Sequence, residues 1–343
     1  MALFVGLDVA KRHTAVCVMN SAGVVIREDV VETTPQAIVA RLRGQRARYA
    51  RIGVESWTLA PWLQSALARA KLPLICIEAA HAHAVLKANL NKTDRTDARG
   101  IADLMRTGAF RPVHIKTAAS QRILALLTTR RFLRAKLTDC QNAIQGLLLA
   151  MGLKLDIAPQ TSFSARAWRL VGRDAHAGQA IQPLINLRDL IASQLAELDR
   201  ALTQLAHSDS ICQLLMSAPG IGPIVALTYR ASIDEPRRFL RSRTIGAHLG
   251  LTPRTHQSGE RERRGGITKH GDSDLRRMLY LAALSTFRRG AKSSWLKSWG
   301  EQIALRRGRK RAIVAIARRL AVVLHRMWIT QTPFQWSRPP ATG

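Results

Sequence analysis

The chain has 343 residues, of which 47% are apolar, so it is long enough for two or three domains with buried cores and is not a disordered protein. Its 53 Lys and Arg outnumber its 23 Asp and Glu, which gives a formal net charge of +30 and favours a nucleic-acid partner. No uncharged run is long enough to span a bilayer, and no basic amphipathic anchor stands alone, so we expect no membrane association. Aromatic residues make up only 5%, which favours phosphate contacts over base stacking.

The four cysteines are widely spaced and form no CxxC pair. Cys17, Cys76, Cys140 and Cys212 are therefore predicted to be reduced core residues rather than zinc ligands or disulfide partners. No basic region precedes the apolar stretch at the start of the sequence, and Asp8 and Lys11 interrupt that stretch, so we expect no signal peptide. We expect a cytoplasmic protein in contact with the nucleoid.

Residues 1–117 alternate between extended and helical patterns. Strands are predicted at 3–9, 14–19, 24–31, 51–55 and 74–78, and helices at 33–42 and 58–70. The order βββαβαβα indicates an α/β domain with a mixed sheet.

Four carboxylates follow the ends of these elements. Asp8 ends the first strand and Glu55 ends the fourth, while Asp94 and Asp97 share one face at the start of a further helix. Taken singly, each has an ordinary explanation, since Asp favours turns and acids favour helix N-termini. If the first and fourth strands are neighbours, however, all four acids can meet, and divalent cations would remove their mutual repulsion. Oxygen-only ligation selects Mg²⁺ or Mn²⁺.

The middle of the chain, 118–208, is purely helical in pattern. Apolar residues recur at alternating threes and fours over 122–153 and 181–205, with a polar loop predicted at 156–179. Such repeats fit an antiparallel helical hairpin, a coiled-coil seam between copies, or ordinary core helices.

The segment 209–330 is predicted to form a mainly α-helical C-terminal domain, followed by a tail at 331–343. Gly220 and Gly222 lie in a turn that resembles the helix-hairpin-helix DNA-binding turn; a plain αα-hairpin turn is the alternative. Residues 250–271 read as a long basic loop that contains Ser258, and 272–286 as a helix. From Arg241 onward there are 22 Lys and Arg against 5 Asp and Glu, which an acidic partner explains better than a solvated face.

Ser258 is the second chemical candidate. A serine hydroxyl is a weak nucleophile unless it is deprotonated or held against an activated phosphate, and neighbouring arginines would stabilise the charge that develops there. On composition alone, Ser-Gly in a loop is more often a turn.

Five motifs occur together in one order. They are Gly6-Leu7-Asp8-Val9-Ala10-Lys11, Glu55-Ser56, Lys92-Thr93-Asp94-Arg95-Thr96-Asp97-Ala98, Pro219-Gly220-Ile221-Gly222 and Ser258-Gly259. Over nearly its full length the chain resembles the DEDD transposases of bacterial insertion sequences, the bridge-RNA-guided serine recombinases. The resemblance implies a RuvC-like (RNase H fold) N-terminal domain, a coiled-coil region and a C-terminal transposase domain.

The resemblance also implies roles for residues. Asp8, Glu55, Asp94 and Asp97 would bind Mg²⁺, and Ser258 would attack DNA to form a phosphoserine link, working with the carboxylates of another protomer. The implied partners are donor DNA, target DNA, a structured noncoding bridge RNA and further copies of the chain, as a dimer that assembles into a tetramer. Predicted nucleic-acid contacts are Lys11, Lys92, Arg95, Arg99, Gly220, Gly222, Arg254, Arg261, Arg263, Arg264, Lys269, Arg276 and Arg277.

Two other functions fit parts of the pattern. A metal-dependent nuclease or Holliday-junction resolvase that uses water needs the four carboxylates but not Ser258. A non-catalytic nucleic-acid-binding protein needs neither, and its DNA binding would survive the change Asp8→Asn.

Overall fold

The computed structural model describes residues 2–43, 48–86, 93–156, 162–172, 174–258, 261–288 and 291–337. The chain divides into two compact units, Met1–Lys116 and Thr117–Gly343. The sequence-based division at residue 208 falls inside the second unit, which contains both the long helices and the C-terminal elements.

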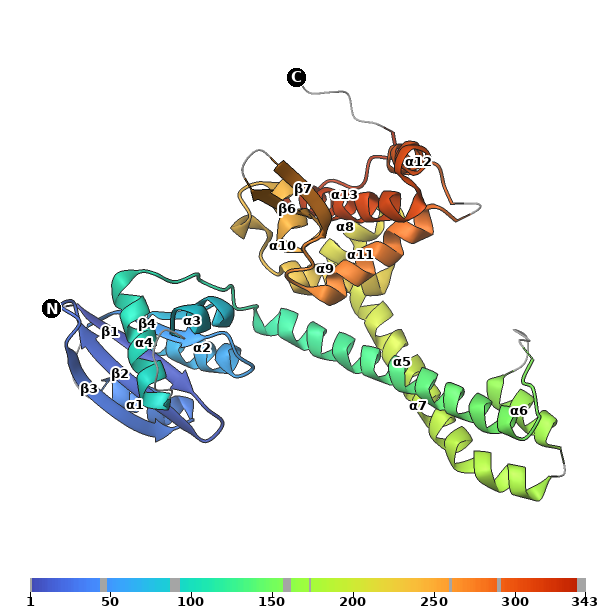
Figure 1. Ribbon diagram of the computed structural model, residues 1–343, viewed down its shortest axis with the longest axis horizontal. Helices are drawn as coiled ribbons and strands as arrows, with labels where there is room; N and C mark the ends of the chain where they lie inside the picture. The colour runs from blue at the N-terminus through green and yellow to red at the C-terminus, as the bar shows by residue number, and fades with distance from the viewer. Residues whose placement is uncertain are drawn as a thin grey trace. The chain divides into compact units, whose positions relative to one another are not determined.

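The first unit is built on a five-stranded mixed sheet in the order β3-β2-β1-β4-β5. The strands are β1 (Leu3–Val9), β2 (His13–Asn20), β3 (Val25–Glu32), β4 (Tyr49–Glu55) and β5 (Leu74–Ile77). β1 is antiparallel to β2 and parallel to β4, so the first and fourth strands are neighbours. The predicted mixed α/β domain is confirmed, and it brings two carboxylate-ending strands side by side (Figure 1).

Helices cover both faces of this sheet. They are α1 (Pro35–Arg43), α2 (Ala60–Arg69), α3 (Ala79–Leu86) and α4 (Asp94–Thr107). One core joins Leu7 and Ile52 of the sheet to Leu42 of α1 and Leu63 of α2. The opposite face packs against α4, whose apolar stripe of Ala98, Ile101, Ala102 and Met105 lies on the sheet.

Glycine is required where α4 crosses the sheet. A Cβ added at Gly6 of β1 would collide with the backbone of Ala98 and Ala102, and one added at Gly53 of β4 would lie 2.7 Å from the Met105 side chain. The helix therefore rests directly on the strand backbones, three residues before the end of β1 and two before the end of β4.

The second unit begins with two long helices, α5 (Ala118–Ala150) and α7 (Ala175–Ser208), which contact each other (Figure 1). The helical prediction is confirmed for both. The predicted loop at 156–179 is wrong in part, because α6 (Phe163–Val171) lies within it, with a Ser162 cap and buried Ala167. A coiled coil stays a prediction.

The rest of the unit is mainly helical. Its elements are α8 (Ser210–Met216), α9 (Pro223–Ile233), η1 (Pro236–Arg238), η2 (Ser242–Thr244), α10 (Ile245–His248), β6 (Pro253–Ser258), β7 (Arg261–Ile267), α11 (Ser273–Thr286), α12 (Trp295–Arg307) and α13 (Arg309–Thr330). The buried Tyr229 hydroxyl of α9 donates to the Ala321 carbonyl of α13, 2.8 Å away, inside the shared core. None of the helices within the described ranges is long and apolar enough to cross a membrane.

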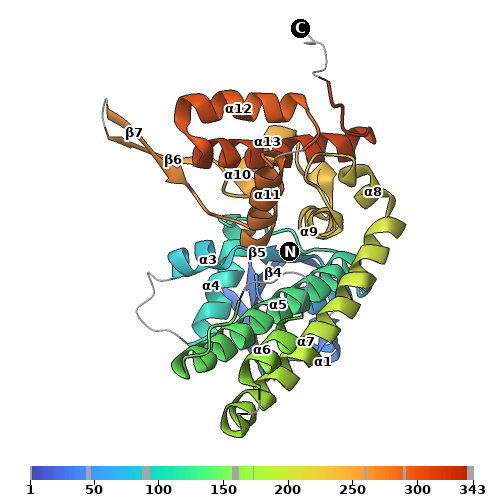
Figure 2. The same cartoon turned by 90° about the vertical axis from the view of Figure 1, so that its right-hand side faces the viewer.

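Within the predicted loop, the two strands β6 and β7 form a β-hairpin. β6 and β7 pair antiparallel, and Figure 2 shows the hairpin projecting away from the helices of its unit. The glycines and arginines of this segment masked its strand pattern. The predicted helix at 272–286 is confirmed as α11, with Asp272 as its cap.

All four cysteines are buried and free, as the sequence predicts. Burial raises the pKa of the Cys17 and Cys76 thiols to about 11 and that of Cys212 to about 12. Because the thiolate is the reactive form, we expect iodoacetamide to label the native protein at pH 8 at least about a hundredfold more slowly than the denatured protein. Mass spectrometry of the labelled chain measures this, and rapid native labelling at Cys17 or Cys212 would contradict the burial.

Candidate active site

Asp8 and Glu55 lie at the same end of neighbouring parallel strands. The register pairs Leu7 with Val54, and each acid is the next residue along its strand. Both side chains are half-buried. Because Gly6 faces α4 and side chains alternate along a strand, Asp8 projects to the same face of the sheet as α4.

The start of α4 supplies the other two acids. Thr93 caps the helix by accepting from the Thr96 backbone nitrogen at 3.2 Å, and the Thr96 hydroxyl closes a reciprocal capping box. Asp94 and Asp97 occupy the first turn, where the helix dipole favours negative charge. Asp97 immediately precedes the buried Ala98, which rests on Gly6, so the first turn of α4 lies near β1.

The four acids do not form a metal-binding cluster here. Within the described ranges, no group of three or more His, Cys, Asp or Glu side chains is placed so that it could hold a metal ion. The donor chemistry nevertheless fits Mg²⁺ or Mn²⁺, because all four groups are carboxylates. What the structure establishes is the adjacency of Asp8 and Glu55 in register.

Ser258 is the last residue of β6, and its backbone pairs with Arg261 at the end of the β6–β7 hairpin. Its side chain and those of Arg261, Arg263 and Arg264 are outside the described part of the structure. Ser258 belongs to the second unit and the four carboxylates to the first.

Several predicted nucleic-acid contacts have protein partners. Arg99 of α4 forms an ion pair with Glu28 of β3, and the hydrogen bond from Arg99 lowers the pKa of that carboxyl. Arg276 donates from Nη1 to the backbone oxygens of Leu249 and His270, both 3.0 Å away, and so fixes the start of α11. For these two arginines the structure shows a structural role.

The other basic positions are more open. Lys11, Arg95 and Lys269 are exposed. The exposed Arg254 donates to the Thr268 carbonyl oxygen at 3.2 Å, across its own hairpin. Lys92 lies outside the described residues.

The glycine turn joins α8 to α9. Gly220 has φ +76°, and an added Cβ would collide with the Ala282 carbonyl of α11, so glycine is required there by conformation and by packing. Gly222 caps α9 in an extended conformation with open space around it. These observations fit an αα-hairpin turn; a DNA-binding role for it stays a prediction.

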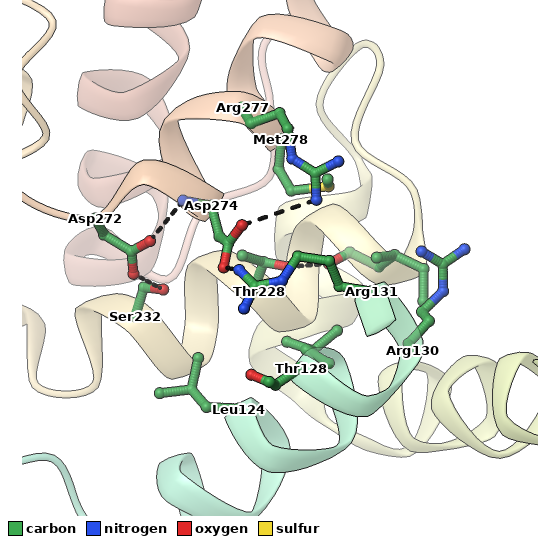
Figure 3. A pocket seen from close by; sticks show the side chains of 12 residues that line it. Leu124, Thr128, Arg130, Arg131, Thr228, Ser232, Asp272, Asp274, Arg277 and Met278 are labelled. Atoms are coloured by element: carbon green, nitrogen blue, oxygen red, sulfur yellow. Dashed lines mark hydrogen bonds and ion pairs between the residues drawn. The ribbon is translucent and has the colours of Figure 1, made fainter. Parts of the chain in front are cut away.

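A small cavity lies between α5, α9 and α11 (Figure 3). Its volume is about 60 Å³, enough for a few water molecules but not for a nucleotide. Asp274 forms an ion pair with Arg131 and lies 3.8 Å from Arg277. The Arg131–Asp274 ion pair therefore links α5 to α11 beside the cavity.

The two aspartates beside this cavity should differ sharply in their effect on stability. Asp272 accepts from the backbone nitrogens of Asp274 and Leu275, each at 3.0 Å, and from the buried Ser232 hydroxyl at 2.7 Å. We expect Asp272→Ala to cost about 2–3 kcal/mol through the lost cap and the unsatisfied hydroxyl. Asp274→Ala should cost about 1 kcal/mol or less, because its ion pairs are partly solvated. Equal melting temperatures for the two variants would contradict this assignment.

Comparisons with known proteins agree with the order of the motifs. Residues 5–152 match a profile of DEDD-type IS110 transposases described as "Transposase", and residues 212–297 match the profile described as "Transposase IS116/IS110/IS902 family". The transposase for insertion sequence element IS1111A of Coxiella burnetii is 31% identical, over 77% of this chain and 73% of its own length. A probable family 20 transposase of Pseudomonas aeruginosa is 29% identical, over 71% of this chain and 74% of its own.

Among solved structures, a Thermus thermophilus RuvC chain is similar over 32% of this chain and 99% of its own length, at 17% identity and a TM-score of 0.23. The sequence relatives show the family. Because one profile matches residues 5–152, another matches residues 212–297 and a transposase is 31% identical over 77% of this chain, the chain belongs to the IS116/IS110/IS902 family of insertion-sequence transposases.

Proposed function

We propose that this transposase cuts and rejoins DNA strands by using the four carboxylates Asp8, Glu55, Asp94 and Asp97 together with the Ser258 hydroxyl. The observation that carries the proposal is the register of β1 and β4, which sets Asp8 and Glu55 side by side at the strand ends. The packing of α4 on Gly6 supports a place for Asp94 and Asp97 near them.

In this proposal the four carboxylates and Ser258 have different roles in the reaction. The carboxylates would hold Mg²⁺ or Mn²⁺, which when bound stabilises the oxygens of a phosphoryl transfer. The Ser258 oxygen attacks the scissile phosphorus, so that one phosphorus–oxygen ester bond forms as the DNA ester bond breaks. The serine proton leaves and the freed DNA hydroxyl takes one up. The energy of the phosphodiester is kept in the protein–DNA link, and rejoining needs no high-energy cofactor.

The partners follow from charge and from family membership. The net charge of +30 suits donor and target DNA, and also the structured bridge RNA that we propose as a guide. We further propose that the chain works as a dimer that assembles into a tetramer, with α5 and α7 as the candidate coiled coil. A RuvC-like origin for the first unit is part of the same proposal.

Metal removal tests the carboxylate half of this proposal. Full-length protein is mixed with labelled DNA that carries the joined ends of the element and with RNA transcribed from the DNA flanking its gene. We expect cleavage with Mg²⁺ and at least about a hundredfold less after chelation with EDTA. DNA binding, followed by fluorescence anisotropy, should persist in the chelator. Cleavage that is equally fast without divalent ions would refute the metal site.

A water-using nuclease is the second candidate. The same carboxylates support it, since two metal ions can activate a water molecule as well as a serine. It differs in leaving no protein attached to the DNA ends.

A further inference from the structure

The most exposed large apolar side chain among the described residues is Leu240, at 99%. It lies between η1 and η2, in a segment that joins α9 to α10. Single exposed leucines are common on protein surfaces, so exposure alone carries no conclusion. What sets Leu240 apart is the way in which its segment is held.

A buried histidine fixes the segment at both ends. His325 of α13 is 1% exposed, and its Nε2 donates to the Pro236 carbonyl oxygen at 2.8 Å, because a carbonyl can only accept. Its Nδ1 then accepts from the Ser242 hydroxyl at 2.9 Å. Pro236 and Ser242 lie on either side of Leu240 in the sequence, so the His325 side chain connects the two ends of the turn that carries Leu240.

The residue before Leu240 is an apolar anchor. The Phe239 ring packs edge-on against His325, with ring centroids 5.7 Å apart, and against His248 at 5.0 Å. The Arg238 guanidinium covers the same ring at 4.1 Å and lies 3.3 Å from His248 Nε2. The Phe239 ring is thus held against the unit, and Leu240, the next residue in the turn, is exposed to solvent above this base.

The surroundings of Leu240 are strongly positive. Residues 236–244 contain four arginines and no acidic residue, and Arg237, Arg241 and Arg243 are exposed. An apolar side chain with arginines on both sides fits a polymer whose outside is negatively charged and whose inside is a stack of uncharged rings. The arginines can bind the charged outside while the apolar side chain enters the stack. Duplex DNA has this character: proteins insert Leu, Ile, Phe or Met between base steps from the minor groove while cations contact the phosphates.

We propose that Leu240 is a wedge that enters a base step of duplex DNA and unstacks it when the 236–244 segment docks on the phosphates. The inference rests on the proposed function only in taking DNA as the substrate. RNA is the less suitable partner, because proteins that bind unpaired RNA stack its bases on aromatic rings or guanidinium planes, and Leu240 is aliphatic. Bending of the DNA at the unstacked base step would help to expose its strands for exchange.

The test uses full-length protein and duplexes carrying the joined ends of the element, with 2-aminopurine placed at one position at a time. The fluorescence of 2-aminopurine rises when the base is unstacked, and anisotropy measures binding separately. The variants are Leu240→Ala, Leu240→Met, which keeps a long apolar side chain, and Leu305→Ala. Leu305 is the matched control: it is 88% exposed and is followed by Arg306 and Arg307, but it lies on α12 and not on a turn held at both ends.

We expect a fluorescence rise at one base step with the unchanged protein, with Leu240→Met and with Leu305→Ala, and its loss with Leu240→Ala. The affinity of Leu240→Ala should stay within about tenfold, because the lost contact is offset by the unstacking cost that is no longer incurred. Binding without a rise at any step, a rise that Leu240→Ala retains, or a rise with duplex RNA only would overturn the inference and leave the proposed function standing. Failure of the unchanged protein to bind DNA would refute both.

Discussion

Asp8→Asn should lower DNA cleavage by about a thousandfold or more while leaving DNA affinity within about threefold. The substitution keeps the size of the side chain and removes its negative charge, so it removes the cation ligand that we propose without opening a gap in β1. Asp8 is half-buried near the end of β1, whereas the preceding Leu7 and its partner Val54 on β4 are buried. The buried pair is not altered by the substitution, so the sheet should keep its stability. Cleavage is measured on labelled DNA, binding by anisotropy, and the fold by circular dichroism.

Asp103→Asn is the matched control for Asp8. Asp103 lies on α4, in the same unit, but its carboxylate pairs with Arg106 one turn along, in a partly exposed ion pair. Such a pair contributes little, so cleavage by Asp103→Asn should stay within about twofold of the unchanged protein. Full cleavage activity of Asp8→Asn would contradict a catalytic role for the strand-end carboxylates. A non-catalytic binding protein would instead bind DNA without metal-dependent cleavage even when unchanged.

Gly6→Ala should destabilise the first unit by about 3–4 kcal/mol, although it adds only one methyl group. The new Cβ would collide with the Ala98 carbonyl and the Ala102 nitrogen, which are backbone atoms that cannot rotate aside. Either α4 lifts from the sheet or β1 shifts, and both movements displace Asp94 and Asp97 from Asp8. Hydrogen exchange of amides in β1 and α4 should accelerate by a few hundredfold, because the free energy of local opening falls by the same amount, about 3–4 kcal/mol.

Gly146→Ala provides the contrast. Gly146 lies in α5 with no atom within 4 Å of the added Cβ, so alanine should be neutral or stabilise the helix by up to about 1 kcal/mol. If Gly6→Ala leaves amide exchange in α4 unchanged, the helix does not rest on β1 as described here.

The N-terminal sheet was predictable because its signals are local. The run 3–9 is apolar until Asp8, and the strand and helix patterns that follow it leave few arrangements that bury every apolar face. The pairing of β1 with β4, which brings Asp8 beside Glu55, was a hypothesis from chain order that the structure confirms. The α11 helix was predictable from Asp272, which caps it.

The structural features that could not be predicted from the sequence have physical causes. The β6–β7 hairpin lacks an apolar face, so its strands are held by backbone pairing that leaves no period in a sequence rich in Arg and Gly. The helix α6 has only nine residues, too few for a clear helical period, although Phe163, Ala167 and Val171 pack into a core. The Arg99–Glu28 ion pair joins residues 71 positions apart, which sequence spacing cannot reveal. The Leu240 turn was missed for the same reason, since its partner His325 lies far along the chain.

If Ser258 is the nucleophile, it becomes covalently linked to DNA during the reaction, and this link can be trapped. Full-length protein, Mg²⁺, RNA from the flanking DNA and labelled joined-end DNA are incubated and run on a denaturing gel. Ser258→Ala is run alongside Ser293→Ala, which removes an exposed serine of the same unit. We expect a DNA-linked protein band that requires Mg²⁺, persists in Ser293→Ala and disappears in Ser258→Ala. Cleaved DNA with no linked band, or a band that survives in Ser258→Ala, would contradict a nucleophilic role for Ser258.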